Sequence, residues 1–295
     1  MLQGLSEFDF CVRRFKGRKG FTLIELLVVI AIIAILAAML LPAMAAAKNK
    51  AHMIEEMSAG RQLMMAMHMY SNDFNDTIMP GYDNHAAATD SWRNPVGSPE
   101  CWRYPWRLAP YVSGSIALLY SGVNQNYLKQ LAANDTDPNH FLYVYIVSLC
   151  PSLGMNGSFV GGDVGEDGMP ADVNAQWGAG TSIGKMTAAR HPSELMVFMS
   201  AQGSPSGIDP SLTANVQQGW FRVTPPYVQT RQWAANYSPS LSPDEWGNVA
   251  PRFNNHAVAA LLDGHVEEFN LQQMQDMRHW CDRATSADWK LGQSN

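Results

Sequence analysis

The sequence predicts an α+β protein in which one long N-terminal helix packs on a β-rich, loop-rich globular head. An apolar run over residues 21–41 contains a single charge, Glu25, and is typical of a membrane-spanning helix. Residues 43–70 lack proline, contain one glycine and carry apolar residues at helical spacing. From Pro80 onward, short strand-like runs alternate with clusters of Gly, Pro, Asn and Asp. With 295 residues, of which 46 % are hydrophobic, the chain can bury a sizeable core.

The charge distribution divides the chain into a basic start and an acidic remainder. Lys and Arg together number 20 against 26 Asp and Glu, so the net charge is −6. Five of the basic residues precede the apolar run, at positions 13, 14, 16, 18 and 19. The remainder has no Lys/Arg-rich run, and nucleic-acid binding is therefore excluded as a function class.

The apolar run has the length of a single membrane crossing. Its 21 residues form about 31 Å of helix, close to the thickness of a bilayer's hydrocarbon core. Because basic residues precede the run and acidic residues dominate after it, we expect a cytoplasmic N-terminus and an exported head.

Three interpretations of this run compete. It could be a plain signal anchor, or a secretory signal peptide cut near Ala45 or Ala47. Neither explains Glu25, since a signal peptide has a shorter, uncharged apolar region and a plain anchor gains nothing from a carboxylate that is costly in a membrane.

The third interpretation comes from residues 19–27, KGFTLIELL, which closely resemble the N-terminal signature of type IV prepilins and type II secretion pseudopilins. The resemblance implies that a prepilin peptidase/N-methyltransferase cuts after Gly20 and methylates the new N-terminal residue, Phe21. It implies that Glu25 then recruits and registers subunits in a growing filament. Physically, cleavage creates a cationic amine one helical turn from that carboxylate.

The resemblance also sets the expected domain boundaries and a pilin-like fold. A cleaved leader, 1–20, precedes a transmembrane helix, 21–41, an amphipathic stem helix, 42–72, and an exported head, 73–295. Pro42 removes a backbone donor and is expected to kink or locally melt the helix. The stem's apolar face is expected to pack on the head through Met53, Met57, Met64 and Met67.

The head is expected to contain short strands and a C-terminal hairpin. Asp263 and Gly264 form a two-residue turn of the kind that closes a hairpin. Residues 278–295 are expected to form a helix with a frayed tail. The candidate strands are 141–149, 195–199, 220–223, 256–262 and 265–269.

Segments of the head resemble a pilin-like family with a processing-associated H-X9-DG domain, notably Asp263-Gly-His-Val266. The chain departs from that pattern, because Phe253 stands where the family has histidine. Asn254 and Asn255 stand where the family favours glycine-like turn residues, which Asn imitates by adopting left-handed backbone geometry.

No motif for catalysis, cofactor binding or metal binding is evident, so we predict a protein that is not an enzyme. The acidic segment with Asp163 is interpreted as a solvated loop rather than a calcium site, together with Glu166, Asp167 and Asp172. Most of the nine tryptophans are expected to fill the core rather than form a sugar-binding platform. One disulfide among Cys101, Cys150 and Cys281 is compatible with export, with the pairing open.

The leading functional hypothesis is a pseudopilin or pilin-like structural subunit of a type II secretion or type IV pilus-like filament. Its expected partners are the prepilin peptidase, other pilin or pseudopilin subunits, the inner-membrane assembly platform and the lipid bilayer. It would cross the inner membrane once, with its head in the periplasm or on a filament surface. The alternative is a membrane-anchored exported module that binds carbohydrate or a surface and uses the prepilin route for display.

Overall fold

The computed structural model describes residues 22–90, 93–112, 116–121, 123–134, 140–164, 180–203 and 219–292. Contacts divide the chain into two compact units, residues 1–48 and 49–295. Helix α1, Leu23–Asp73, contributes to both units.

The described part of the first unit is the N-terminal stretch of α1. Its large apolar side chains are exposed, from Leu23 to Leu41. Among the described residues, α1 is the one helix long and apolar enough to span a membrane, and its most apolar stretch is not buried by protein. An apolar helix that is uncovered on all sides is suited to lipid or to other apolar helices.

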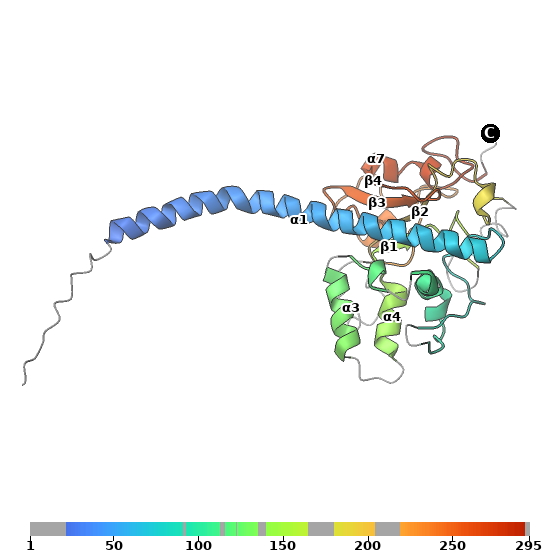
Figure 1. Ribbon diagram of the computed structural model, residues 1–295. Coiled ribbons are helices and arrows are strands. Elements are labelled where there is room, and N and C mark those ends of the chain that lie inside the picture. Colours follow the sequence, from blue (N-terminus) through green and yellow to red (C-terminus); the bar gives the residue numbers. More distant parts are fainter. Residues whose placement is uncertain are drawn as a thin grey trace, which may run out of the picture. The chain divides into compact units, whose positions relative to one another are not determined.

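The second unit is built on a four-stranded sheet with the order β1-β2-β3-β4, antiparallel at every pairing (Figure 1). Its strands are β1 (Leu153–Met155), β2 (Met196–Ser200), β3 (His256–Leu261) and β4 (Val266–Asn270). The register pairs His256 with Asn270 and Gly154 with Met199. The predicted strands at 195–199, 256–262 and 265–269 are confirmed to within a residue or two.

The second half of α1 packs on one face of this sheet. Met53, Met64 and Met67 are buried in the same core as Val258 of β3 and Val266 of β4. The approach is close at Gly60, where an added Cβ would lie 3.4 Å from the Cβ of Ala260. The predicted amphipathic stem with a methionine-rich buried face is therefore confirmed, and α1 ends at Asp73, within the run of turn-forming residues.

The opposite face of the sheet carries a second core. Along β3 the side chains alternate, since Val258 and Ala260 belong to the first core while Ala257, Ala259 and Leu261 belong to the second. The second core is rich in tryptophan, with Trp233, Trp246, Trp280 and Trp289 buried. Two short segments, α7 (Leu271–Met274) and the 3₁₀ turn Met277–His279, follow β4.

The described chain between α1 and β1 contains loops and short helices, and one of these helices corrects a strand prediction. Residues 141–149 form helix α4 (Phe141–Leu149), not a strand. It contacts α2 (Tyr104–Leu108) and α3 (Val123–Asn134), and Figure 1 shows α3 and α4 running beside each other. Because nearly every residue of the segment is apolar, its sequence shows no helical period. A short apolar run of this kind can form either a buried strand or a buried helix.

Two further predictions were wrong in the described chain. Residues 220–223 contribute only an isolated bridge, between Arg222 and Met155, rather than a strand. The predicted helix at 278–295 is also not found: residues 278 and 279 end the 3₁₀ segment, residues 280–292 form turns and coil, and residues 293–295 lie outside the described residues. Trp280 and Trp289 anchor this stretch separately in the second core.

Candidate functional site

A hydrogen-bonded pair, Thr22 and Glu25, closes the start of α1. The backbone N–H and the Oγ1 hydroxyl of Thr22 both donate to Oε2 of Glu25, at 2.8 and 2.7 Å. The backbone N–H of Glu25 donates to Oγ1 of Thr22 at 3.3 Å. This reciprocal arrangement is a capping box, which satisfies donors that the first helical turn leaves unpaired.

The capping box leaves half of the Glu25 carboxylate available. Both Thr22 bonds end on Oε2, and no described residue donates to Oε1. Gly20 and Phe21 lie outside the described residues, so cleavage and methylation at these positions stay predictions. Glu25 is exposed at the apolar end of α1, where its free oxygen could accept a hydrogen bond from a cationic amine.

Pro42 lies inside α1, and the helix runs through it without interruption. Local melting at this position is therefore not observed. The kink stays a prediction, with its basis in the lost backbone donor and the clash with the carbonyl one turn earlier.

Asp263 and Gly264 lie in the turn between β3 and β4, as the sequence indicated. Gly264 has a φ of +96°, a left-handed conformation that favours glycine, and its N–H donates to the carbonyl of Leu261 at 2.9 Å. The Asp263 carboxylate accepts the backbone N–H of His265 at 3.0 Å. These bonds fix the turn locally, and they indicate a structural role.

The segment before β3 shows what replaces the expected histidine. Phe253 is buried in the first core, and its backbone exchanges two 3.0 Å hydrogen bonds with His256. Asn254 and Asn255 between them have φ values of +53° and +63°. The prediction that these asparagines imitate glycine is confirmed, and Phe253 acts as an apolar anchor for the turn.

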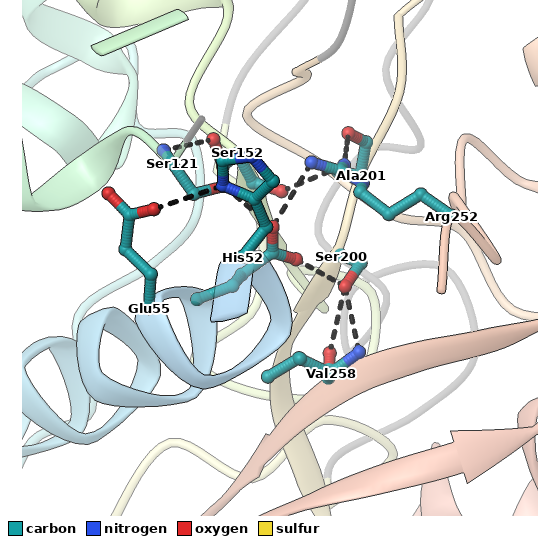
Figure 2. Close-up of polar contacts among 9 residues, drawn as sticks. His52, Glu55, Ser121, Ser152, Ser200, Ala201, Arg252 and Val258 are labelled. Atoms are coloured by element: carbon teal, nitrogen blue, oxygen red, sulfur yellow. Dashed lines mark hydrogen bonds and ion pairs between the residues drawn. The ribbon is translucent and has the colours of Figure 1, made fainter. Parts of the chain in front are cut away.

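The sequence analysis missed a polar cluster around Glu56, a residue of α1 whose side chain is fully buried. Its carboxylate accepts hydrogen bonds from the hydroxyls of Ser121, at 2.7 Å, and Ser200. Arg252 completes the set with an ion pair from Nη1 at 3.2 Å. Figure 2 shows Ser121, Ser200 and Arg252 converging from separate segments of the chain.

Further bonds extend this cluster into the sheet. Nη2 of Arg252 donates to the backbone carbonyls of Ser152, at 3.3 Å, and Ala201. The Ser200 hydroxyl accepts the N–H of Val258 at 2.8 Å, which ties β2 to β3 (Figure 2). The cluster thus joins α1 to the sheet through a buried charge pair. Hydrogen bonds satisfy the Glu56 carboxylate and both Nη atoms of Arg252, while Nε of Arg252 has no partner among the described residues.

A second buried pair corrects the interpretation of the acidic segment. Asp163 is buried, with Oδ2 lying 2.9 Å from Nη2 of Arg222 and Oδ1 accepting the N–H of Tyr82 at 3.0 Å. It is therefore part of the folded core rather than of a solvated loop. The other three acids of that segment, Glu166, Asp167 and Asp172, lie outside the described residues. No cluster of metal-ligating residues is found within the described part of the chain.

The cysteines and tryptophans have structural surroundings. Cys101, Cys150 and Cys281 are buried and free, so no disulfide joins them. Burial raises the pKa of the Cys150 thiol to about 12 and that of Cys281 to about 11, which leaves both thiols protonated and unreactive. The prediction that tryptophans fill the core is confirmed for Trp106 and for the four in the second core.

Comparison with known families identifies the N-terminal segment. Residues 15–41 match the family described as the prokaryotic N-terminal methylation motif. No curated protein and no solved structure matches the chain. The matched residues include the predicted cleavage position, the capping box and most of the apolar stretch of α1. The chain therefore carries a prepilin-type methylation signal at the start of an α+β fold.

Proposed function

We propose that this chain is a non-enzymatic pilin-like subunit, made as a prepilin, cut after Gly20 and methylated at Phe21. The observation that carries the proposal is the methylation motif over residues 15–41. This motif implies processing by a prepilin peptidase and a pilin- or pseudopilin-like role. Assignment to a type II secretion or type IV pilus-like filament is the finer part of the proposal.

The chemistry of the proposed cleavage follows from what lies around Glu25. Hydrolysis after Gly20 turns an amide nitrogen into a cationic amine at Phe21, next to the capping residue Thr22. Oε1 of Glu25 is the oxygen that Thr22 does not use, which supports a role as acceptor for such an amine. A pair of this kind within one chain or between two chains offsets the cost of holding a carboxylate near a membrane.

The exposed apolar stretch of α1 supports assembly through this helix. Its side chains find no partner among the described residues of this chain, and Ile33 and Leu40 are more than half exposed. In the bilayer they would contact lipid, and in a filament they would contact the same stretch of neighbouring subunits. The head would remain in the periplasm or on the filament surface, with the N-terminus cytoplasmic before cleavage.

Mass spectrometry of the protein extracted from membranes tests the processing step. We expect an N-terminus at methylated Phe21, and an uncut chain when Gly20→Leu blocks entry of the backbone into the protease. Recovery of the wild-type chain only with Met1, or with a new terminus at Ala46 or Lys48, would refute the proposal.

Crosslinking between engineered cysteines in the apolar stretch tests the assembly step. Glu25→Gln keeps an acceptor for the Thr22 bonds but removes the charge, so it separates helix capping from charge pairing. We expect Glu25→Gln to be processed and inserted into membranes but to lose crosslinks between chains. Wild-type levels of crosslinking in this variant would show that the charge plays no part in assembly.

A further inference from the structure

The head contains a cavity of about 600 Å³ between the end of α1 and the segment that follows it. This volume falls within the range of about 300–1,000 Å³ that is usual for small-molecule sites. All its lining residues belong to the second unit, between Tyr70 and Tyr111. It lies apart from the proposed processing and assembly residues, and nothing in the fold requires it.

Aromatic rings form one wall of the cavity. Tyr70 and Phe74 stack with ring centroids 4.3 Å apart, and Tyr111 meets Tyr70 edge to face at 5.8 Å. Phe74 is 50 % exposed, although most large aromatic side chains of the head are buried. The hydroxyl of Tyr111 donates to Asp73 at 3.1 Å, which holds its ring in place. The wall is thus a fixed aromatic surface open to solvent.

Arg107 supplies the positive charge of the cavity. One guanidinium nitrogen, Nη2, donates to the carbonyl of Pro80, while Nε is buried without a hydrogen-bond partner. No described carboxylate forms an ion pair with it. Burial lowers the pKa of Arg107 to about 10, which reflects a charge held away from water.

The opposite wall provides polar groups on a hydrogen-bonded loop. The N–H of Val96 donates to the carbonyl of Ala88 at 2.9 Å, and Thr89 forms a bridge with Pro95. The Asp83 carboxylate also lines the cavity; its Oδ1 accepts the backbone N–H of His85 at 3.0 Å and lies 3.6 Å from Nδ1 of that side chain. Asp83 can accept hydrogen bonds from ligand hydroxyls, and Thr89 can exchange them.

We propose that this cavity binds an acidic saccharide, with a sugar ring on the Tyr70–Phe74 surface and the sugar carboxylate on Arg107. Aromatic rings suit the apolar face of a sugar. The sugar carboxylate would accept from the guanidinium N–H groups of Arg107 that border the cavity, since Nε itself is enclosed by protein. A neutral sugar would leave Arg107 with only the attraction of Asp83, which lies beyond ion-pair distance, and would bind more weakly. The site does not depend on cleavage or filament assembly, so it goes beyond the proposed function.

Isothermal titration calorimetry on the full chain in detergent tests this site, with digalacturonic acid as the probe and neutral galactobiose as the comparison. We expect saturable binding of the acidic disaccharide, at least tenfold tighter than of the neutral one. Phe74→Ala removes the exposed ring of the stacked pair and should weaken binding tenfold or more. Phe141→Ala is the matched control, because Phe141 is similarly exposed and stacks on Tyr145 outside the cavity.

Further variants distinguish sugar binding at this cavity from the proposed assembly role of Glu25. Arg107→Gln should remove the preference for the acidic sugar, and Phe74→Ala tests the site independently should Arg107→Gln fail to fold. Glu25→Gln should bind the disaccharide as tightly as the wild type, whatever its effect on assembly. The proposal is overturned by absence of saturable binding, by equal affinity for the two disaccharides, or by wild-type affinity in Phe74→Ala.

Discussion

Replacing Glu56 with alanine should destabilise the head more than any change on the exposed face of α1. The substitution removes the acceptor of Ser121, Ser200 and Arg252 at once. The Arg252 side chain is 10 % exposed, so its charge would remain buried beside the gap. Breaking a buried pair by removing one partner costs about 3–5 kcal/mol. We expect a loss of unfolding free energy in this range.

The adjacent residue Glu55 provides a matched control. Its carboxylate is 41 % exposed, and among the described residues its one polar partner is Nδ1 of His52, at 3.4 Å (Figure 2). Glu55→Ala should therefore change the unfolding free energy by less than about 0.5 kcal/mol. Urea unfolding of the detergent-solubilised chain, followed by tryptophan fluorescence, measures both variants. A loss below about 1 kcal/mol for Glu56→Ala, or equal losses for the two, would refute the assignment of Glu56 as the buried partner of Arg252.

Two further predictions concern thiol chemistry and the hairpin turn. The thiolate is the reactive form of cysteine, and burial raises the pKa of Cys150 and Cys281. A thiol reagent at pH 8 should therefore label these two residues only after unfolding. Labelling at equal rates in native and unfolded chains would contradict this prediction. Folding favours the protonated thiols, so they contribute fully to the unfolding free energy below the ordinary thiol pKa of 9.0, and this contribution is lost as the pH rises above 9.0. Comparing the unfolding free energy at pH 8 and pH 10 measures this loss. Gly264→Val places a branched side chain at a φ of +96° and should cost about 1–3 kcal/mol in the same urea assay, whereas Gly264→Asn should cost less; equal costs would argue against backbone strain.

The elements predicted correctly are those whose signal is local. The turn at Asp263-Gly264 and the two strand-like runs that flank it are recognisable from adjacent residues. The methionine face of α1 follows from helical spacing over many turns, and the exposed apolar stretch follows from composition. In each case the signal lies within one contiguous segment of the chain.

Helix α4 shows why other elements were mispredicted. Within it, Phe141, Leu142 and Tyr145 are the more exposed residues, and their spacing is helical. All three are apolar, so the sequence gives no contrast between the two faces. Packing against α2 and α3, which no local pattern encodes, decides the conformation.

The sequence showed that Glu56 lies on the buried face of the helix, but it did not show which residue pairs with it. Glu56 falls at helical spacing between Met53 and Gly60, on the same stripe that buries Leu63 and Met67. A carboxylate on such a stripe demands a partner. Arg252 lies 196 positions away in sequence, and only the folded chain brings it to Glu56.

Helix α1 also determines where the head can be separated from its anchor. Nine of its residues are buried, from Met53 to Ser71, and they complete one of the two cores. A version truncated ahead of Asn49 would keep every one of them, whereas removal of the whole helix up to Asp73 would leave one face of the sheet uncovered. Trimming at the head's own first loop would therefore yield an insoluble fragment rather than a free domain.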